Sequence, residues 1–390
     1  MKLKAIFQIY KVILFTPLLL YFGNRSYLAF DEGFYALQAR WIIQNNNWII
    51  PYWWDSYSLD RTIGIQFLIA KFQQLFGETV FVAHIPTTIA SCLMLFLTFK
   101  LHQELLEKKE AIISAIILST TYLWLDFAHL ATQDMIFACL VTLGIYSLSK
   151  IQSQGNNIHN FIFGSWIGLA FMMKTFLVGV PIISFFPYIF YKRDIIRWKI
   201  LFLGILIGFI PFFVWTALIN QYLDKNIFLF LFDKLAELSS ENNFTNPFYY
   251  YLWNIPINFL PWSLFGILGL KYQQKNKLGT KKILFDYPII YIVIISIFST
   301  KTPYYALPIA SILSLNAYLG IKAILKNEDL KFLFINIISR ILPLILLSII
   351  FIYWRMFRNS LNLNTKEELF LIKDFACTTF VFILIGQIKK

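Results

Sequence analysis

The chain alternates between long apolar segments and short polar connections, and this pattern limits its fold more than any other feature of the sequence. Of its 390 residues, 58% are hydrophobic and only 14% are charged. Because a helix of about 20 residues spans the roughly 30 Å hydrocarbon core of a bilayer, the segments predict an all-α polytopic membrane protein with about 12 transmembrane helices. We therefore expect a single transmembrane domain over residues 1–390, with no soluble C-terminal domain.

The basic residues gather in the loops of one side of the predicted bundle. The most basic loop contains Lys271, Lys275, Lys277, Lys281 and Lys282. Cytoplasmic loops are enriched in Lys and Arg, so the pattern predicts a multi-pass protein of the cell (inner) membrane with both termini in the cytoplasm. The same rule accounts for the net charge of +13 without a nucleic-acid partner.

The apolar segments and this orientation together predict where each helix lies. Helices are expected at about 6–22, 80–100, 111–125, 160–173, 176–191, 200–219, 251–270, 284–299, 303–321 and 371–388. Two more are expected, one that follows Asp134 and ends at Lys150 and one that ends near Trp354. Two long outer loops remain, at about 23–79 and 220–250. Within 34–76 aromatic residues alternate with polar ones, which is typical of amphipathic helices that lie in the membrane interface. Whether 62–76 crosses the membrane is left open by its length and composition.

Two adjacent acids, Asp31 and Glu32, follow the first apolar segment and lie between Phe30 and Phe34. Ionisable groups beside a membrane helix are costly and therefore candidates for function, the alternative being a polar helix end. The predicted topology brings other polar residues to the same outer face, namely Asp60, Arg61, Asp126, His129, Asp134, Lys174 and Lys301. They form either a reactive site or a set of salt bridges at helix ends.

Acids and cations on one wet membrane face suit a reaction in which an alcohol or amine attacks a group carried on a lipid phosphate. The attacking group needs a general base, and the departing phosphate needs fixed positive charge or a divalent metal. A membrane transporter or flippase for lipid-linked sugars is the rival interpretation. Its essential charges are expected near the middle of the bilayer, whereas these lie at one face.

Several short motifs follow one another along the chain. They are Asp31-Glu32-Gly33-Phe34-Tyr35-Ala36, Asn47-Trp48 with Pro51, Asp60-Arg61, Gln133-Asp134, Met173-Lys174-Thr175, Pro247-Phe248-Tyr249-Tyr250-Tyr251, Leu260-Pro261-Trp262 and Ser299-Thr300-Lys301-Thr302-Pro303-Tyr304-Tyr305. In this order they resemble the GT-C superfamily of polyprenyl-phosphate-sugar-dependent glycosyltransferases. The resemblance is strongest to the branch that holds the lipid A aminoarabinose transferases and the protein O-mannosyltransferases.

The resemblance implies roles for particular residues. Asp31 corresponds to the general base or acceptor-orienting acid, with Glu32 beside it and Asp134 as the second acid of the catalytic set. The residues expected to bind the donor phosphate or line its path are Arg61, Lys174, Lys301, Tyr35 and Tyr305. For Lys174, snorkelling at a helix end is an equally good interpretation.

Two departures from the family pattern affect what the site could bind. Phe34 stands where the aminoarabinose transferases have Arg, so one phosphate or acceptor contact is missing. The His that precedes the Pro-Phe motif in metal-binding relatives is also missing. No cofactor is therefore certain, although a divalent metal (Mg, Mn or Zn) stays open, with Asp60 as a ligand beside the oxygens of Asp31 and Glu32.

The resemblance implies a glycosyltransferase that moves a sugar, with inversion, from a polyprenyl-phosphate-linked donor to an acceptor at the outer face of the membrane. The acceptor could be lipid A, a glycolipid, a polysaccharide or a protein. Beside the transporter, a second alternative is a catalytically degenerate member of the family with an assembly role, which the missing His and Phe34 would suit.

Overall fold

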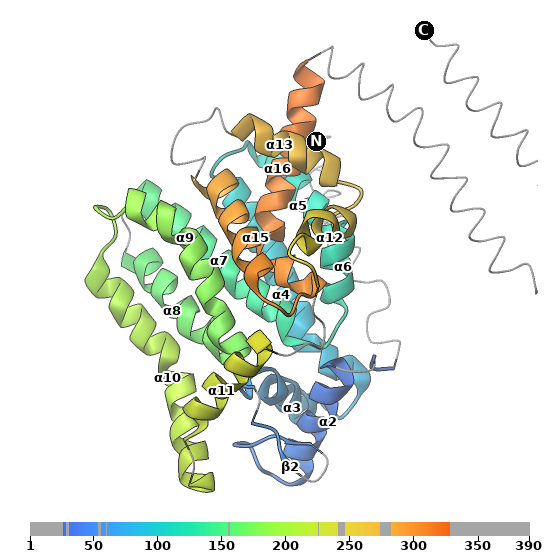
Figure 1. Cartoon of the computed structure of the whole chain (residues 1–390), viewed down its shortest axis with the longest axis vertical. Coiled ribbons are helices and arrows are strands. Elements are labelled where there is room, and N and C mark those ends of the chain that lie inside the picture. The colour runs from blue at the N-terminus through green and yellow to red at the C-terminus, as the bar shows by residue number, and fades with distance from the viewer. Residues whose placement is uncertain are drawn as a thin grey trace, which may run out of the picture. The chain divides into compact units, whose positions relative to one another are not determined.

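The computed structural model describes residues 26–28, 31–53, 56–59, 61–154, 157–224, 226–240, 246–273 and 282–327 (Figure 1). The chain divides into two compact units, Met1–Gly320 and Ile321–Lys390, and the elements that build the site belong to the first. The helices predicted at 6–22, before Trp354 and at 371–388 lie outside the described residues, as does Asp60.

The described chain is helical almost throughout, as predicted, and five stretches in it are long and apolar enough to cross a membrane. Three of these stretches lie in single helices, namely α4 (Val80–His102), α7 (Gln133–Gln154) and α10 (Trp198–Leu223). The fourth is a continuous run of α8 (Asn157–Lys174), η2 (Thr175–Val178) and α9 (Gly179–Tyr191). The fifth consists of η4 (Pro303–Ile309) and α16 (Ala310–Lys326). A sixth arises if α5 (Lys108–Ser119) and α6 (Tyr122–Ala128) form one span, although they are bent by 68°. The protein is thus a membrane protein with an all-α fold.

Glycines hold α8 and α10 together. A Cβ atom on Gly164 or Gly168 would lie 2.1–2.2 Å from the backbone of α10, and one on Gly204 or Gly208 would lie 2.2 Å from the backbone of α8. Because apolar side chains gain little by leaving lipid, membrane helices associate through such close backbone approach. The two Gly-xxx-Gly pairs therefore determine how closely these helices pack.

Replacing Gly208 by Ala is expected to lower the melting temperature of the detergent-solubilised protein. The new methyl group would meet the carbonyl oxygen of Ser165 at 2.2 Å, and overpacking of this kind costs about 1–3 kcal/mol. Gly179→Ala is the matched control, because no atom lies within 4 Å of its added Cβ. An equal shift in both variants would contradict the packing role of Gly208.

The predicted outer segment folds into short elements that pack together beside α4 (Figure 1). They are α2 (Asp31–Gln44), a hairpin of β1 (Tyr52–Trp53) and β2 (Ser56–Tyr57) that pairs Tyr52 with Tyr57, and α3 (Gly64–Phe76). At 1.5 Å per residue α3 is about 20 Å long, which is too short to cross the hydrocarbon core. Trp215 of α10 donates a hydrogen bond to the carbonyl oxygen of Ile49 at 2.8 Å and ties the segment to the bundle.

Two predicted helices are interrupted in the structure. The helix expected at 111–125 breaks between α5 and α6, where the hydroxyl groups of Thr120 and Thr121 bond to carbonyl oxygens of the preceding turn. The helix expected at 251–270 consists of α12 (Tyr250–Asn258) and α13 (Ser263–Gln273). Pro261 lies between them, and proline cannot continue the helical hydrogen-bond pattern. Side-chain competition for the backbone and proline thus override continuous apolar sequence.

The other differences are smaller. The outer loop predicted at 220–250 contains a helix, α11 (Ile227–Ser240). The helix expected at 284–299 begins with a π-helical turn, η3 (Lys282–Asp286), and continues as α15 (Tyr287–Ile297).

Candidate active site

The first half of the candidate site is the N-terminus of α2, where Asp31 and Glu32 occupy the first turn. Carboxylates are favoured at that end of a helix by the partial positive charge of its free N–H groups. The side chain of Asp31 is 41% exposed, and its Oδ1 lies 3.2 Å from Nη1 of Arg61. Asp31 is therefore both paired with a cation and accessible to a substrate.

Arg61 is held in place by aromatic side chains. Its Nη1 donates to the hydroxyl oxygen of Tyr35 at 2.6 Å, and its guanidinium lies 5.1 Å from the centre of the Phe34 ring. Phe34 in turn packs against Trp53 of the hairpin at 4.6 Å. Tyr35 is buried, and that burial raises the pKa of its hydroxyl well above the usual range. Tyr35 therefore stays neutral and orients Arg61.

The second half of the site is an ion pair between Asp134, in the first turn of α7, and Lys174, the last residue of α8. Both side chains are nearly buried, with 5% and 7% of their surfaces exposed. The Lys174 ammonium also lies 4.2 Å from the centre of the Tyr304 ring and 5.4 Å from that of Tyr305. Cation–π contacts of this kind partly replace the water that the ammonium has lost.

The backbone around Lys174 is unusual. Thr175 follows it with φ at 45°, a left-handed conformation that β-branched residues rarely adopt. Two residues before Lys174, the carbonyl oxygen of Met172 would lie 2.3 Å from a Cβ on Gly64. The absence of a side chain on Gly64 thus lets α3 pack directly against the end of α8.

The two halves lie within electrostatic reach of each other. Tyr35, in the first half, is close enough to interact electrostatically with Asp134 as well as with Asp31 and Arg61. Tyr305, half-buried in η4, interacts with Asp134, Arg61 and Asp31. The structure thus brings together six of the residues selected from the sequence: Asp31, Arg61, Tyr35, Asp134, Lys174 and Tyr305.

Lys301 is engaged by the backbone. Its ammonium donates to the carbonyl oxygen of Asn246 at 2.8 Å and to those of Phe298 and Ser299. The Asn246 side chain returns a hydrogen bond to the Lys301 carbonyl oxygen at 3.1 Å, and burial lowers the pKa of Lys301. These contacts join two loops, and the phosphate-binding role expected of Lys301 stays a prediction.

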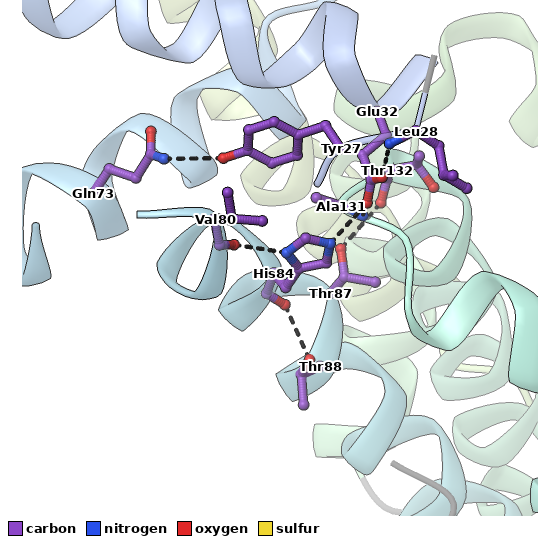
Figure 2. Close-up of polar contacts among 10 residues, drawn as sticks. All are labelled: Tyr27, Leu28, Glu32, Gln73, Val80, His84, Thr87, Thr88, Ala131 and Thr132. Carbon is purple, nitrogen blue, oxygen red and sulfur yellow. Dashed lines mark hydrogen bonds and ion pairs between the residues drawn. The ribbon is translucent and has the colours of Figure 1, made fainter. Parts of the chain in front are cut away.

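Glu32 is also buried, with 2% of its surface exposed, and it contacts His84 of α4 (Figure 2). His84 was not among the residues selected from the sequence. Its position could have identified it, because His84 is an ionisable residue inside an apolar helix, and such a residue is costly unless it has a partner.

The described residues do not form an evident metal site. Among them, no three His, Cys, Asp or Glu side chains lie close enough together to hold an ion. Asp31 faces Arg61, Asp134 faces Lys174, and both oxygens of Glu32 accept hydrogen bonds from the protein. Asp60 lies outside the described residues, so a metal there is an expectation from the sequence alone.

Comparison with known proteins connects this geometry to a family. Residues 60–217 match the family model described as dolichyl-phosphate-mannose-protein mannosyltransferase. The structure aligns with ArnT from Cupriavidus metallidurans bound to undecaprenyl phosphate with a TM-score of 0.75, at 16% identity, over 88% of this chain and 64% of that one. The chain is thus similar in sequence and in fold to glycosyltransferases of the kind that its motifs resemble.

Curated proteins that resemble this chain carry the name undecaprenyl phosphate-alpha-4-amino-4-deoxy-L-arabinose arabinosyl transferase. The protein from Edwardsiella ictaluri is 26% identical over 71% of this chain and 52% of its own length. The one from Wigglesworthia glossinidia brevipalpis is 28% identical over 91% of this chain and 66% of its own length. The chain thus spans about half to two thirds of the length of these relatives.

Proposed function

We propose that this protein is an integral membrane glycosyltransferase. It would move a sugar from a polyprenyl-phosphate-linked donor to an acceptor at the outer face of the inner membrane. The observation that carries the proposal is Asp31, an accessible carboxylate next to Arg61 and within electrostatic reach of the buried Asp134–Lys174 pair by way of Tyr35 and Tyr305.

In the proposed reaction, a hydroxyl or amino group of the acceptor attacks the anomeric carbon of the sugar. Asp31 accepts the proton from the attacking group, and a positioned general base of this kind contributes about 10²–10⁴-fold. The bond between the anomeric carbon and the phosphate oxygen breaks, and its electron pair leaves with the lipid phosphate. A single attack opposite the leaving group inverts the anomeric centre.

Two cations would stabilise the phosphate as it departs. Arg61 is the more accessible, with 33% of its side chain exposed, and its orientation is already determined by Tyr35 and Phe34. Lys174 lies deeper, against Tyr304 and Tyr305. Fixed charges of this kind cost no reorganisation during the reaction, which makes them effective at developing negative charge.

The relatives support a donor with an undecaprenyl-phosphate-type carrier, since that lipid appears in their names and is bound in the ArnT structure. The sugar and the acceptor are separate questions. Phe34 follows Asp31 by three residues and packs against Trp53 and the Arg61 guanidinium, so we expect this position to offer a substrate no charge of its own. Lipid A, another glycolipid, a polysaccharide and a protein all remain acceptor candidates.

Reconstituted vesicles test the proposal. The full chain is supplied with undecaprenyl phosphates carrying a panel of radiolabelled sugars and with an envelope extract as acceptor. We expect one labelled donor to be consumed and its label to appear on an acceptor. Movement of the intact donor across the membrane without bond cleavage would establish a transporter instead, and donor binding without turnover on any acceptor would establish a degenerate member of the family.

A further inference from the structure

The carboxylate of Glu32 joins three separate segments of the chain (Figure 2). Oε2 accepts the backbone N–H of Leu28 at 2.6 Å, just before α2. Oε1 accepts the N–H of Ala131 at 2.8 Å, in the turn between α6 and α7, and lies 2.7 Å from Nε2 of His84 in α4. Both oxygens are thus occupied by the protein, and the carboxylate is not available to a substrate.

The hydrogen-bond partners determine how many protons this group holds. Nδ1 of His84 lies 2.7 Å from the carbonyl oxygen of Val80, and a carbonyl only accepts, so Nδ1 carries a hydrogen. One further proton must lie between Nε2 and Glu32 Oε1, since two bare acceptors would repel at their separation. The pair then has no net charge, which makes its burial tolerable.

The environment of His84 strengthens the junction. The ring of Tyr27 stacks on the imidazole, with centres 6.0 Å apart and planes 13° apart. One turn further along α4, the hydroxyl of Thr87 donates to the carbonyl oxygen of Thr132 at 3.3 Å. The turn that contains Ala131 and Thr132 is thus bonded both to Glu32 and to α4.

The position of the junction relates it to both acids of the site. Glu32 directly follows Asp31 in the first turn of α2, and Ala131 precedes Asp134 by three residues. Any movement of the 129–132 turn relative to α2 would therefore change the position of Asp134 relative to Asp31. The family resemblance placed Glu32 in the catalytic set, but its burial and its occupied oxygens indicate a different task.

We propose that Glu32 and His84 are positioning residues, which set the two acids of the site relative to each other through one neutral, proton-sharing pair. The proposal rests on the proposed glycosyl transfer for its catalytic consequence. Its structural content, that one carboxylate couples the segment before α2 to the 129–132 turn, is independent of any activity.

Amide hydrogen exchange of the full chain in detergent tests the coupling. In Glu32→Ala and in His84→Ala, amide exchange is expected to accelerate about tenfold or more at both Leu28 and Ala131. Glu32→Ala removes the acceptor of both amide groups, and His84→Ala removes the side chain that holds this acceptor in place. His84→Gln is expected to restore protection at both sites, since its amide oxygen can accept a hydrogen bond from protonated Glu32, which keeps the buried pair uncharged. Glu78→Gln, which changes an exposed acid near the start of α4, is the matched control. Acceleration at only one of the two segments, or no rescue by His84→Gln, would overturn the proposal.

A kinetic measurement then connects the junction to catalysis. With the donor identified in the vesicle assay, Glu32→Ala and His84→Ala are expected to lower kcat by about 100-fold with little change in the KM for the donor, as expected when an acid is misplaced rather than a binding group removed. His84→Gln should recover most of kcat. If the unmodified protein transfers no sugar, the proposed function fails while the exchange result still stands. If the unmodified protein transfers sugar but kcat is unchanged in both Ala variants, the positioning role fails alone.

Discussion

Replacing Asp31 by Asn is expected to lower sugar transfer by about 10³-fold or more, because the amide cannot accept the proton of the attacking group. The substitution keeps the size of the side chain and its place in the first turn of α2. It also removes the charge that faces Arg61 at 3.2 Å. That exposed pair contributes little to stability, so the melting temperature should change by no more than a few degrees.

Two companion variants make this result specific. Asp31→Glu keeps a carboxylate but moves it by one methylene group, so partial activity is expected, lower than that of the unmodified protein and higher than that of Asp31→Asn. Asp194→Asn applies the same chemical change to an aspartate that is 89% exposed and distant from the site in sequence, and it should leave turnover unchanged. Near-normal turnover in Asp31→Asn, measured with labelled donor in vesicles, would rule out Asp31 as the base.

The membrane-spanning helices were the most predictable part of the fold. The segments predicted at 80–100 and 200–219 correspond to Val80–His102 and Trp198–Leu223. The requirement to satisfy every backbone group within lipid leaves a long apolar segment few alternatives to a helix. The interruptions near Thr120 and Pro261 depend on local competition for backbone hydrogen bonds, which apolar content does not report.

The site was less predictable than the helices. The outer-face topology selected Asp31, Arg61, Asp134 and Lys174 from three outer connections, but it could not indicate which acid faces which cation. The pairing of Asp134 with Lys174 depends on how α8 ends, and the left-handed backbone of Thr175 is not expected of a β-branched residue. Tertiary packing, not local preference, determines that conformation.

The different burial of Asp31 and Glu32 was also not predictable from the sequence. Asp31 and Glu32 are adjacent and chemically alike, yet one is accessible and the other has 2% of its surface exposed. Helix geometry turns successive residues by about 100°, so adjacent acids on one helix face different surroundings. A sequence motif therefore locates the pair, whereas the structure separates an accessible acid from a buried one.

The buried ion pair of Asp134 and Lys174 leads to the second large effect. Removing one partner leaves the other charge buried without compensation, and such changes cost about 3–5 kcal/mol in other proteins. Asp134→Asn and Lys174→Met are therefore each expected to lower the melting temperature in detergent strongly. The double variant, in which neither charge remains, should recover most of that stability. If each single variant unfolds at the temperature of the unmodified protein, the pair is not a buried structural ion pair.

Activity in the double variant then separates stability from chemistry. If Asp134 and Lys174 serve only to stabilise the fold, a stable double variant should transfer sugar at nearly the normal rate. If the ammonium also stabilises the departing phosphate, as we expect from its position against Tyr304 and Tyr305, the double variant should fold and yet turn over about 100-fold more slowly. Lys174→Arg is the matching probe, since it keeps the charge but places it differently. Slow turnover in a well-folded double variant would assign the pair to the reaction. Faster turnover in Lys174→Arg than in Lys174→Met, both with Asp134 intact, would assign the cation.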